Sequence, residues 1–347
     1  MPTPNPPLPT LTSDLPGIGG VIKSRLEDFD VEEIPAYQPS GEGEFLFLWI
    51  EKRGLSAEQL TSHLAKFFGI AHQDVGMAGM KDRHAVTRQF VSVPARCEPR
   101  LPSIQHDGIR VLSVARHRNK LRTGHLRGNR FSILVRDCES DAADRAAAIA
   151  DRIRTSGIAN YFGDQRFGRD GETLQLGFEL LRGAKSPADI ARVRRKFLLR
   201  LALSAVQSHL FNLILAERIN DGLIHRVLSG DVMQVVASGG PFVVEDAARE
   251  QTRFDAREIV ATGPLFGPKM KQPLGEVAPR ESRVLEQFQL EPAAFARYAN
   301  LTSGTRRPFL IWPEDLLVEP EPAGIRLRFT LPSGCYATVL LNEFQKS

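Results

Sequence analysis

The stretch "GMAGMKDRHAVTRQF" (residues 76–90) places one carboxylate among cations in a glycine-marked turn. Asp82 follows Lys81 and precedes Arg83, and Gly79 lies just before them. Glycine lets a backbone approach a ligand closely, and a turn can present a side chain that regular packing would bury. Two interpretations of Asp82 stay open on this evidence: a group used for chemistry, or a turn former of the kind common after glycine.

Around this turn, apolar runs typical of strands alternate with helical patterns. Leucine and phenylalanine at helical spacing predict a helix over 56–70, with Ser56 as its N-cap, and a second helix over 142–157 ends at Gly157. Buried or alternating runs predict four strands, over 44–52, 88–95, 109–117 and 130–137.

The second half of the chain changes character. Residues 160–175 are rich in glycine and aromatic residues, which predicts a loop at a domain junction, and 186–222 predicts one long helix or two abutting helices starting near Pro187. Residues 230–310 carry many breaks and are expected to be irregular, whereas 324–344 returns to strand, turn and apolar strand or helix. This order predicts one α+β domain interrupted by an inserted, largely helical domain.

Composition and cysteine content limit the classes of protein that fit. The chain has 347 residues, of which 42% are hydrophobic and 25% charged, so it suits two globular domains. Cys97, Cys138 and Cys335 lie far apart without a CxxC pair, which argues against a disulfide framework or structural zinc and favours a reducing cytosol. No span or signal peptide is expected, and the proline-rich start predicts a flexible arm. The predicted location is therefore cytoplasmic, without a membrane partner.

Positive charge is concentrated in one region although the net charge is only +4. Residues 108–136 contain no Asp or Glu. Two interpretations fit such a stretch, a surface that binds a polyanion and a solvated loop, and the single sign of its charges favours the first. The cations of this stretch are Arg110, Arg116, Arg118, Lys120, Arg122, Arg127, Arg130 and Arg136. A second cluster of cations lies over 192–200. It fits a site for a ligand anion and a solvated helix face equally well. Phosphate-loop, HExxH and GxSxG signatures are all missing.

Five segments in order resemble the TruD family of tRNA pseudouridine synthases. "AGMKDRHAVTRQF" (78–90) is similar to the family motif GxKDxxAxTxQ. The other four segments are "IKSRLEDFDVEEIP" (22–35), "LRGNRFSILVR" (126–136), "NYFGDQRFG" (160–168) and "LPSGCYATVLLNEF" (331–344). The resemblance covers the chain from about residue 20.

The resemblance implies a fold and a domain plan. It implies an α+β pseudouridine synthase catalytic core, with an extended mixed or antiparallel sheet flanked by helices, interrupted by an inserted α/β family-specific (TRUD) domain. The chain then divides into an arm over 1–19, a discontinuous catalytic domain over 20–158 and 310–347, and an inserted domain over 159–309. It also implies the substrate, uridine 13 of tRNA, and no obligatory protein partner.

The resemblance also assigns site residues. The aspartate of the family's KD motif, its catalytic residue, falls on Asp82. Substrate-pocket positions fall on Phe29, Asn129 and Tyr336, the last of which is usually phenylalanine in the family. Its added hydroxyl needs a partner or water. We add Lys81 and Arg166 as candidate substrate-binding residues, and a predicted RNA-backbone patch formed by Arg116, Arg118, Lys120, Arg122 and Arg127.

The implied chemistry needs no metal or cofactor, because the isomerisation oxidises nothing and takes no group from outside. A carboxylate can act as nucleophile or base on a flipped-out uridine, and a nearby cation such as Lys81 would oppose the rise in its pKa on burial. Two alternatives remain at this point. One is a catalytically silent RNA-binding protein of the same fold that acts as a tRNA-folding chaperone; the other is a structural protein without RNA affinity.

Overall fold

The computed structural model describes residues 8–346, without the side chain of Arg169. Within these residues the chain forms two compact units. The large-sheet unit consists of Asp14–Thr155, Trp312–Ala337 and the described residues from Leu341 onward. The α4 unit consists of Ser156–Ile311, Thr338–Leu340 and the described residues before Asp14.

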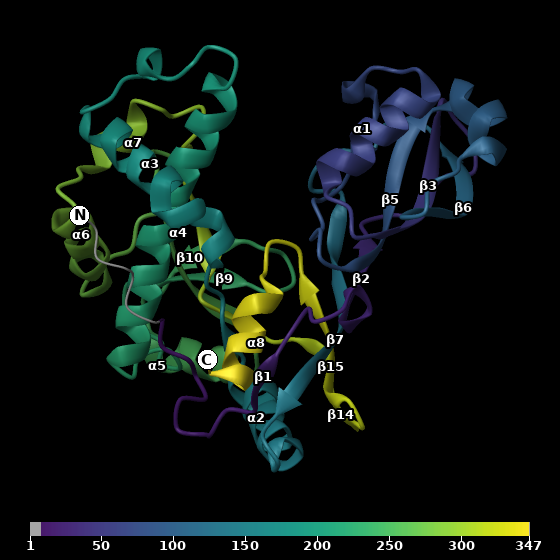
Figure 1. The fold of residues 1–347 in the computed structure, drawn as a ribbon. Helices are drawn as coiled ribbons and strands as arrows, with labels where there is room; N and C mark the ends of the chain where they lie inside the picture. The colour runs from purple at the N-terminus through teal and green to yellow at the C-terminus, as the bar shows by residue number, and fades with distance from the viewer. Residues whose placement is uncertain (1–7, 347) are drawn as a thin grey trace. The chain divides into compact units, whose positions relative to one another are not determined.

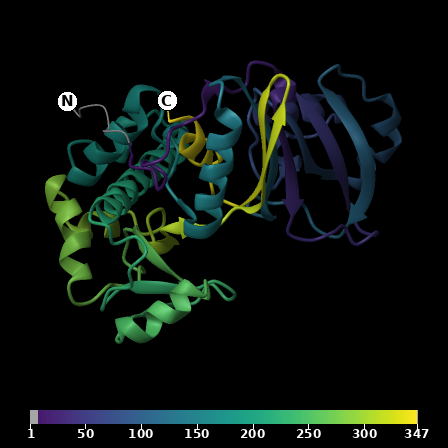
Figure 2. The ribbon, with the colours of Figure 1, turned by 90° about the horizontal axis from the view of Figure 1, so that it is seen from below.

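The large-sheet unit is built on a nine-stranded sheet that is ordered β14-β15-β7-β2-β5-β3-β6, with β1 beside β7 and β4 beside β5 (Figures 1 and 2). Only the β2–β5 pair is parallel among the described pairs of this sheet. The elements are β1 (Gly19–Val21), β2 (Phe29–Pro35), β3 (Phe45–Arg53), α1 (Ala57–Phe68), β4 (Gly76–Met77), β5 (Val86–Pro94), β6 (Ile109–His117), β7 (Leu126–Cys138), α2 (Ala142–Ser156), β14 (Glu314–Glu321), β15 (Gly324–Pro332) and α8 (Ala337–Gln345).

Helix α1 forms where the sequence predicts it, for identifiable local reasons. The Ser56 side chain accepts a hydrogen bond from the Gln59 N–H, and Gly69 ends the helix in the left-handed conformation with φ of 67°. Its apolar stripe, which includes Leu60 and Leu64, packs on fully buried side chains of β3 such as Ile50. One face of the β3–β5 region is thereby closed to water.

The α4 unit surrounds a long buried helix. An antiparallel sheet ordered β10-β9-β11-β12 and a two-stranded β13-β8 sheet accompany it. Helices α3 and α4 approach closely at Gly177, which has no side chain. A Cβ at this position would lie 2.2 Å from the Ala202 carbonyl oxygen. The elements are β8 (Ile158–Ala159), α3 (Glu172–Arg182), α4 (Arg195–Asn220), β9 (Val232–Val235), β10 (Pro241–Val243), α5 (Ala247–Asp255), β11 (Ile259–Leu265), α6 (Val277–Gln287), α7 (Pro292–Ala296), β12 (Thr305–Pro308) and β13 (Leu310–Ile311).

Helix α4 also bears on the expectation that the chain has no membrane span. It is the one helix among the described residues that is long and apolar enough to cross a membrane, but 67% of its apolar window is buried inside the protein. This burial is typical of a core helix, which needs apolar side chains on most of its faces.

The local predictions are confirmed in the first half of the chain and are wrong in parts of the second. The predicted strands and helices over 44–157 all form, and 324–344 resolves into a strand and helix α8. The α+β class is confirmed. Residues 230–310 are not irregular, because they form β9–β11, α5–α7 and β12. Strand β11 pairs with β9 and β12, which are distant in the sequence, and such pairing leaves no local signal. Helix α4 is one helix, and it begins at Arg195 instead of near Pro187.

The predicted domain plan is compatible with the two units, but which unit is catalytic stays a prediction. Residues 1–7 of the predicted arm lie outside the described residues. The rest of that segment is ordered: Ile18 is fully buried, and its N–H donates to the Phe344 carbonyl at 2.8 Å. A free arm therefore does not extend to residue 19.

Candidate active site

Asp82 lies in the turn between β4 and β5 of the large-sheet unit, and both of its carboxylate oxygens are engaged. Oδ1 accepts a hydrogen bond from the His84 N–H at 3.0 Å, which closes a tight local turn. Oδ2 forms an ion pair with the ammonium of Lys23. The side chain keeps 24% of its surface exposed. A charged carboxylate is therefore held in one orientation and is still accessible from solvent.

Lys23 is the site residue that our sequence reasoning missed. It precedes β2 with φ of 61°, an uncommon conformation for a residue with a side chain. Its ammonium lies 4.6 Å from the ring centroid of Phe29, a cation–π distance. Lys23, Asp82 and Phe29 thus form one contiguous group. Lys23 lies in the family-like segment 22–35, but its pairing with Asp82 leaves no local signal because the two residues are 59 positions apart.

The protonation state of Asp82 follows from two opposing effects. Burial raises the pKa of the carboxyl, while the hydrogen bond and charge of Lys23 and the N–H of His84 lower it. The lowering effects are larger, so the pKa of Asp82 lies below its ordinary value and the group is ionised at neutral pH.

Lys81 is not the cation that keeps Asp82 ionised. Its ammonium turns to Glu33 of β2, with 2.6 Å between Nζ and Oε2, and both side chains are almost fully buried. Burial raises the pKa of the Glu33 carboxyl, and the Lys81 charge opposes that rise. The chain neighbours in "MKDR" therefore point to different partners, because successive residues of a turn do not share a direction.

The other predicted pocket residues belong to the same unit. Phe29 is buried on β2, and Asn129 of β7 lies directly opposite Glu33 in the sheet. The side-chain oxygen of Asn129 is buried and has no hydrogen-bond partner among the described residues. Tyr336 is half-buried at the start of α8. Its loop adjoins β7, since Ser333 N–H donates to the Arg127 carbonyl at 2.9 Å.

Arg166 is not part of this group in the large-sheet unit. It belongs to the α4 unit, where its guanidinium contacts the hydroxyls of Ser204 and Ser208 and lies 5.9 Å from the Phe162 ring centroid. Both serines are on α4, so Arg166 fixes the 3-10 turn at Asp164–Phe167 against that helix. Its role as a substrate-binding residue stays a prediction.

Some cations of the predicted RNA-backbone patch have acidic or carbonyl partners in space, and the patch itself stays a prediction. Arg116 pairs with Glu98, and Arg118 pairs with Glu42. Lys120 donates to the backbone carbonyl of Gln73. The acidic partners come from other segments of the fold, which a count along residues 108–136 cannot include.

Two cations of this patch have no such partner. Arg122 and Arg127 are exposed and have no hydrogen bond or ion pair from their side chains among the described residues. Arg122 borders an open hollow of about 440 Å³ on the large-sheet unit. The hollow is lined by Tyr37, Gln38, His117, Asn119, Lys120, Arg122 and His125. This is the part of the patch that is free to meet an anionic ligand.

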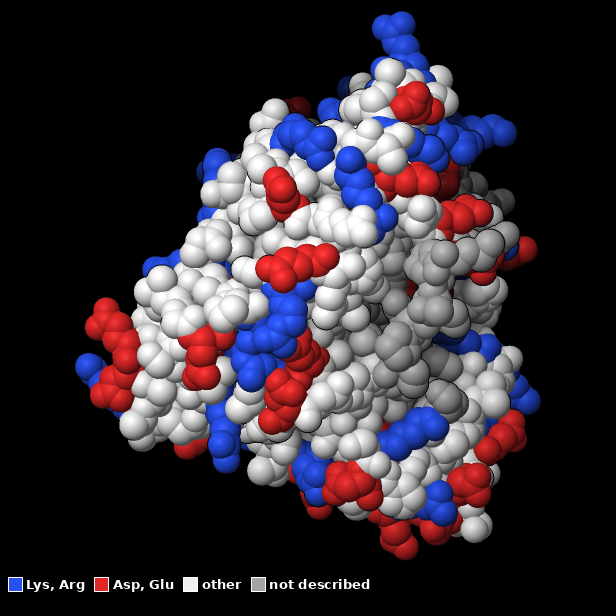
Figure 3. All heavy atoms as spheres, turned by 90° about the vertical axis from the view of Figure 1, so that its left-hand side faces the viewer, with Lys and Arg blue, Asp and Glu red and all other residues white. Residues whose placement is uncertain are grey.

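Side chains of both charges are interspersed on the surface that Figure 3 shows. On the face that Figure 3 shows, Lys and Arg side chains lie among Asp and Glu side chains instead of gathering into one patch. Such mixed surfaces carry little net field and do not by themselves attract a polyanion.

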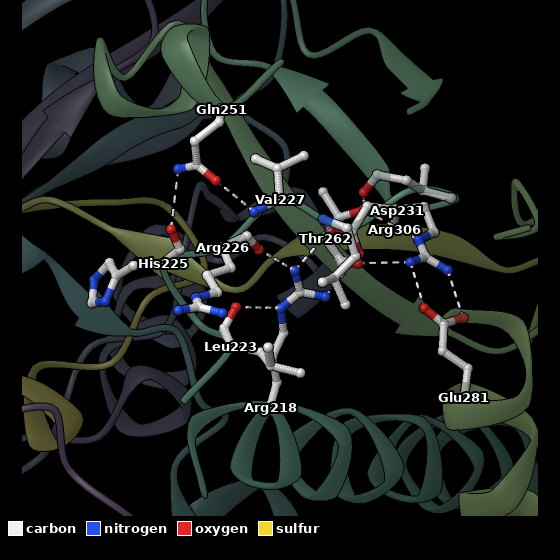
Figure 4. Close-up of polar contacts among 12 residues, drawn as sticks. Arg218, Leu223, His225, Arg226, Val227, Asp231, Gln251, Thr262, Glu281 and Arg306 are labelled. Carbon is white, nitrogen blue, oxygen red and sulfur yellow. Dashed lines mark hydrogen bonds and ion pairs between the residues drawn. The ribbon is translucent and has the colours of Figure 1, made fainter. Parts of the chain in front are cut away.

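A second polar cluster lies inside the α4 unit (Figure 4). Arg218 binds both carboxylate oxygens of Asp231 at 2.7 Å, and Arg306 binds both oxygens of Glu281 at 2.8 and 2.6 Å. All four side chains are at most 6% exposed. The cluster is a structural network, since its charges are paired and shielded from solvent. No group of three or more metal-binding side chains is found among the described residues.

Comparisons with known proteins agree along nearly the whole chain. The family model of tRNA pseudouridine synthase D (TruD) matches residues 8–191 and 185–344. A tRNA pseudouridine synthase D of Anaeromyxobacter dehalogenans is 44% identical over 98% of this chain and 97% of its own length. One of Thermus thermophilus is 41% identical over 97% of this chain and 92% of its own.

Comparison with solved structures gives the same fold. A crystal structure from Methanosarcina mazei that carries the TruD designation matches with a TM-score of 0.75 at 24% identity, covering 97% of this chain and 95% of that one. Identity with two curated relatives above 40% over almost their full lengths leaves no large segment of either without a counterpart. The chain belongs to the TruD family of tRNA pseudouridine synthases.

Proposed function

We propose that this protein isomerises a uridine of tRNA, at position 13, to pseudouridine, with Asp82 as the catalytic residue. One observation carries the proposal: the ionised carboxylate of Asp82 is held by Lys23 beside the ring of Phe29, while part of its surface stays exposed. Family membership supports the reaction class. The large-sheet unit is then the catalytic domain, the α4 unit is the inserted domain, and the protein works in the cytoplasm.

The reaction breaks the bond from ribose C1′ to uracil N1 and forms one from C1′ to C5. N1 gains a proton and C5 loses one, so atoms balance without a cofactor. A carboxylate can serve as the nucleophile at sugar or base, or as the base that removes a proton. Either role requires an ionised carboxylate. Asp82 meets this requirement because the Lys23 ammonium keeps it ionised despite burial.

The pocket must also take up a base that has left the RNA stack. The Phe29 and Tyr336 rings offer apolar faces, and the unpaired oxygen of Asn129 can accept a hydrogen bond from a uracil N–H. Lys81 acts on the substrate indirectly, through its ion pair with Glu33, which lies opposite Asn129 in the sheet. Arg166 acts through the packing of the α4 unit.

The alternative that the sequence left open, a catalytically silent RNA-binding protein of the same fold, has no support from the relatives, which are named as synthases. Both functions require affinity for tRNA, but only the enzyme requires a carboxylate at Asp82. A tRNA transcript tritiated at uracil C5 separates them, because pseudouridine formation releases the C5 label into water. Release by this protein supports the enzyme, and binding without release from any tRNA of a plausible host supports the alternative.

Replacing Lys23 with methionine is expected to move the acid limb of the kcat/KM pH profile upward. Activity in this mechanism needs ionised Asp82. Without Lys23, burial raises the pKa of that carboxyl unopposed by its largest favourable partner, so a higher pH is required to ionise it. Rates of tritium release measured across the acid pH range give the position of this limb. Lys23→Arg is the matched control, since it keeps the positive charge. An acid limb that stays in place in Lys23→Met would contradict the assignment.

Neutralising Arg122 and Arg127 with glutamine is expected to flatten the dependence of log tRNA affinity on log salt. These exposed cations have no protein partner among the described residues, so phosphates can take that place. The slope should fall by roughly one unit for each phosphate that the protein no longer neutralises. Arg328→Gln is the control, because Arg328 is exposed in the same unit but pairs with Glu319 at 2.8 Å. Equal slopes in all three proteins would place the RNA-binding surface elsewhere.

A further inference from the structure

Lys52 of β3 has the least expected surroundings of any lysine in the large-sheet unit. Its side chain is fully buried, in a strand whose other residues on that face are apolar, such as Leu48 and Ile50. The ammonium donates two hydrogen bonds, to the backbone carbonyl of Leu55 and to the backbone carbonyl of Asp82, each at 2.7 Å. Burying a charge costs free energy unless it is well bonded, so a lysine here needs a specific reason.

The hydrogen bond to Asp82 links the sheet to the backbone in the middle of the catalytic turn, residues 78–85. At the two ends of the turn, the Ala78 carbonyl accepts from Gly124 N–H at 2.8 Å and the Ala85 carbonyl from Gly54 N–H at 3.4 Å. Between these ends, the Lys52 bond is the only hydrogen bond from outside the turn to its backbone, as far as the described residues show. The direction of the Asp82 peptide therefore depends on Lys52.

The surroundings leave the ammonium available for this role. The residues directly opposite Lys52 are Thr87 on β5 and Ile109 on β6, and both are neutral. The charged groups that face it are Asp82 and Lys81, whose side chains are engaged by Lys23 and Glu33 respectively. Among the described residues Lys52 thus makes no ion pair, and its ammonium bonds to backbone carbonyls.

We propose that Lys52 is a positioning residue, whose ammonium holds the backbone carbonyl of Asp82 and so directs the carboxylate toward Lys23 and the substrate. The inference rests on the proposed function, since it assigns a role within the same site. A carboxylate that must approach one atom of the nucleoside loses much of its effect when displaced by about 1 Å, which can cost on the order of 100-fold in rate.

The proposal has a consequence for pH. Burial lowers the pKa of Lys52 to about 8, Asp82 opposes that fall and Lys81 adds to it. Above that pH the amine becomes neutral and loses one donor and its charge, so its bonds to the two carbonyls weaken. Turnover of the parent protein should therefore decline as the pH rises through about 8.

Lys52→Met tests the role directly, because methionine has similar length without charge or donor. We expect turnover to fall roughly 10- to 100-fold, tRNA affinity to stay within about threefold, and the decline above pH 8 to disappear. The matched control is Ile50→Ala, on the same face of the same strand, which creates a cavity without touching Asp82. It should lower the melting temperature but keep the parental turnover and pH profile.

Amide hydrogen exchange gives a readout that does not depend on activity. The His84 N–H is protected by the Asp82 carboxylate, so it should exchange faster in Lys52→Met than in Ile50→Ala. Parental exchange and turnover in Lys52→Met would overturn the proposal. If Lys52→Met fails to fold, two other results test the proposal. Lys52→Arg, which keeps charge and donors, should fold and retain activity. A parent protein whose turnover does not decline above pH 8 would overturn the proposal. A parent protein that releases no tritium refutes the proposed function instead, and the exchange result still decides the role of Lys52.

Discussion

Replacing Asp82 with asparagine is expected to eliminate pseudouridine formation while leaving tRNA affinity within about tenfold of the parent, or roughly 1.4 kcal/mol. Only the transition state needs the carboxylate, so its loss should affect turnover far more than binding. Asparagine keeps an oxygen that can accept the His84 N–H, so the turn should persist. Binding can even tighten, since a negative charge near phosphates is removed. Single-turnover tritium release and a binding titration on the same tRNA measure the two effects.

The control for this variant is Asp74→Asn, in the same unit but outside the catalytic turn. It should keep the parental turnover, and both variants should melt close to the parent. Conversion by Asp82→Asn at a rate near that of the parent would refute the catalytic assignment. Global unfolding of Asp82→Asn, with Asp74→Asn intact, would show that Asp82 is a structural turn residue.

The largest effect on stability is expected from Asp231→Ala in the α4 unit. Asp231 binds Arg218 through both oxygens and also accepts the Leu228 N–H at 2.8 Å, while only 1% of its side chain is exposed (Figure 4). Removing one partner leaves a buried guanidinium without its counterion, which costs about 3–5 kcal/mol. Denaturant unfolding followed by a signal from the α4 unit gives the free energy of unfolding.

An exposed pair in the same unit provides the comparison. Glu217 pairs with Arg283 at 3.0 Å, and more than half of the Arg283 side chain is exposed. Glu217→Ala should cost less than about 1 kcal/mol, because water screens exposed ion pairs. Equal losses in Asp231→Ala and Glu217→Ala would mean that burial of the Arg218 pair contributes nothing.

The sequence by itself determined the elements whose signals are local. Helix α1 could be predicted because Ser56 and Gly69 mark its ends and its apolar residues recur at helical spacing. Strand β6 could be predicted because apolar and polar residues alternate along much of Ile109–His117. Family motifs added Asp82, Phe29, Asn129 and Tyr336, although the chemistry of Asp82 alone was ambiguous between a site and a turn. Short strands such as β11 and β12 were missed, since each pairs with a segment that is distant in the sequence.

Tertiary structure alone decided which charges meet. Lys23 reaches Asp82 across 59 positions, while Lys81, its neighbour in the sequence, turns to Glu33. The support of the Asp82 backbone by Lys52 depends on sheet register, which no local pattern reports. The same holds for the acids that neutralise Arg116 and Arg118. Coulomb and hydrogen-bond energies depend on separation in space, and the sequence gives separation only along the chain.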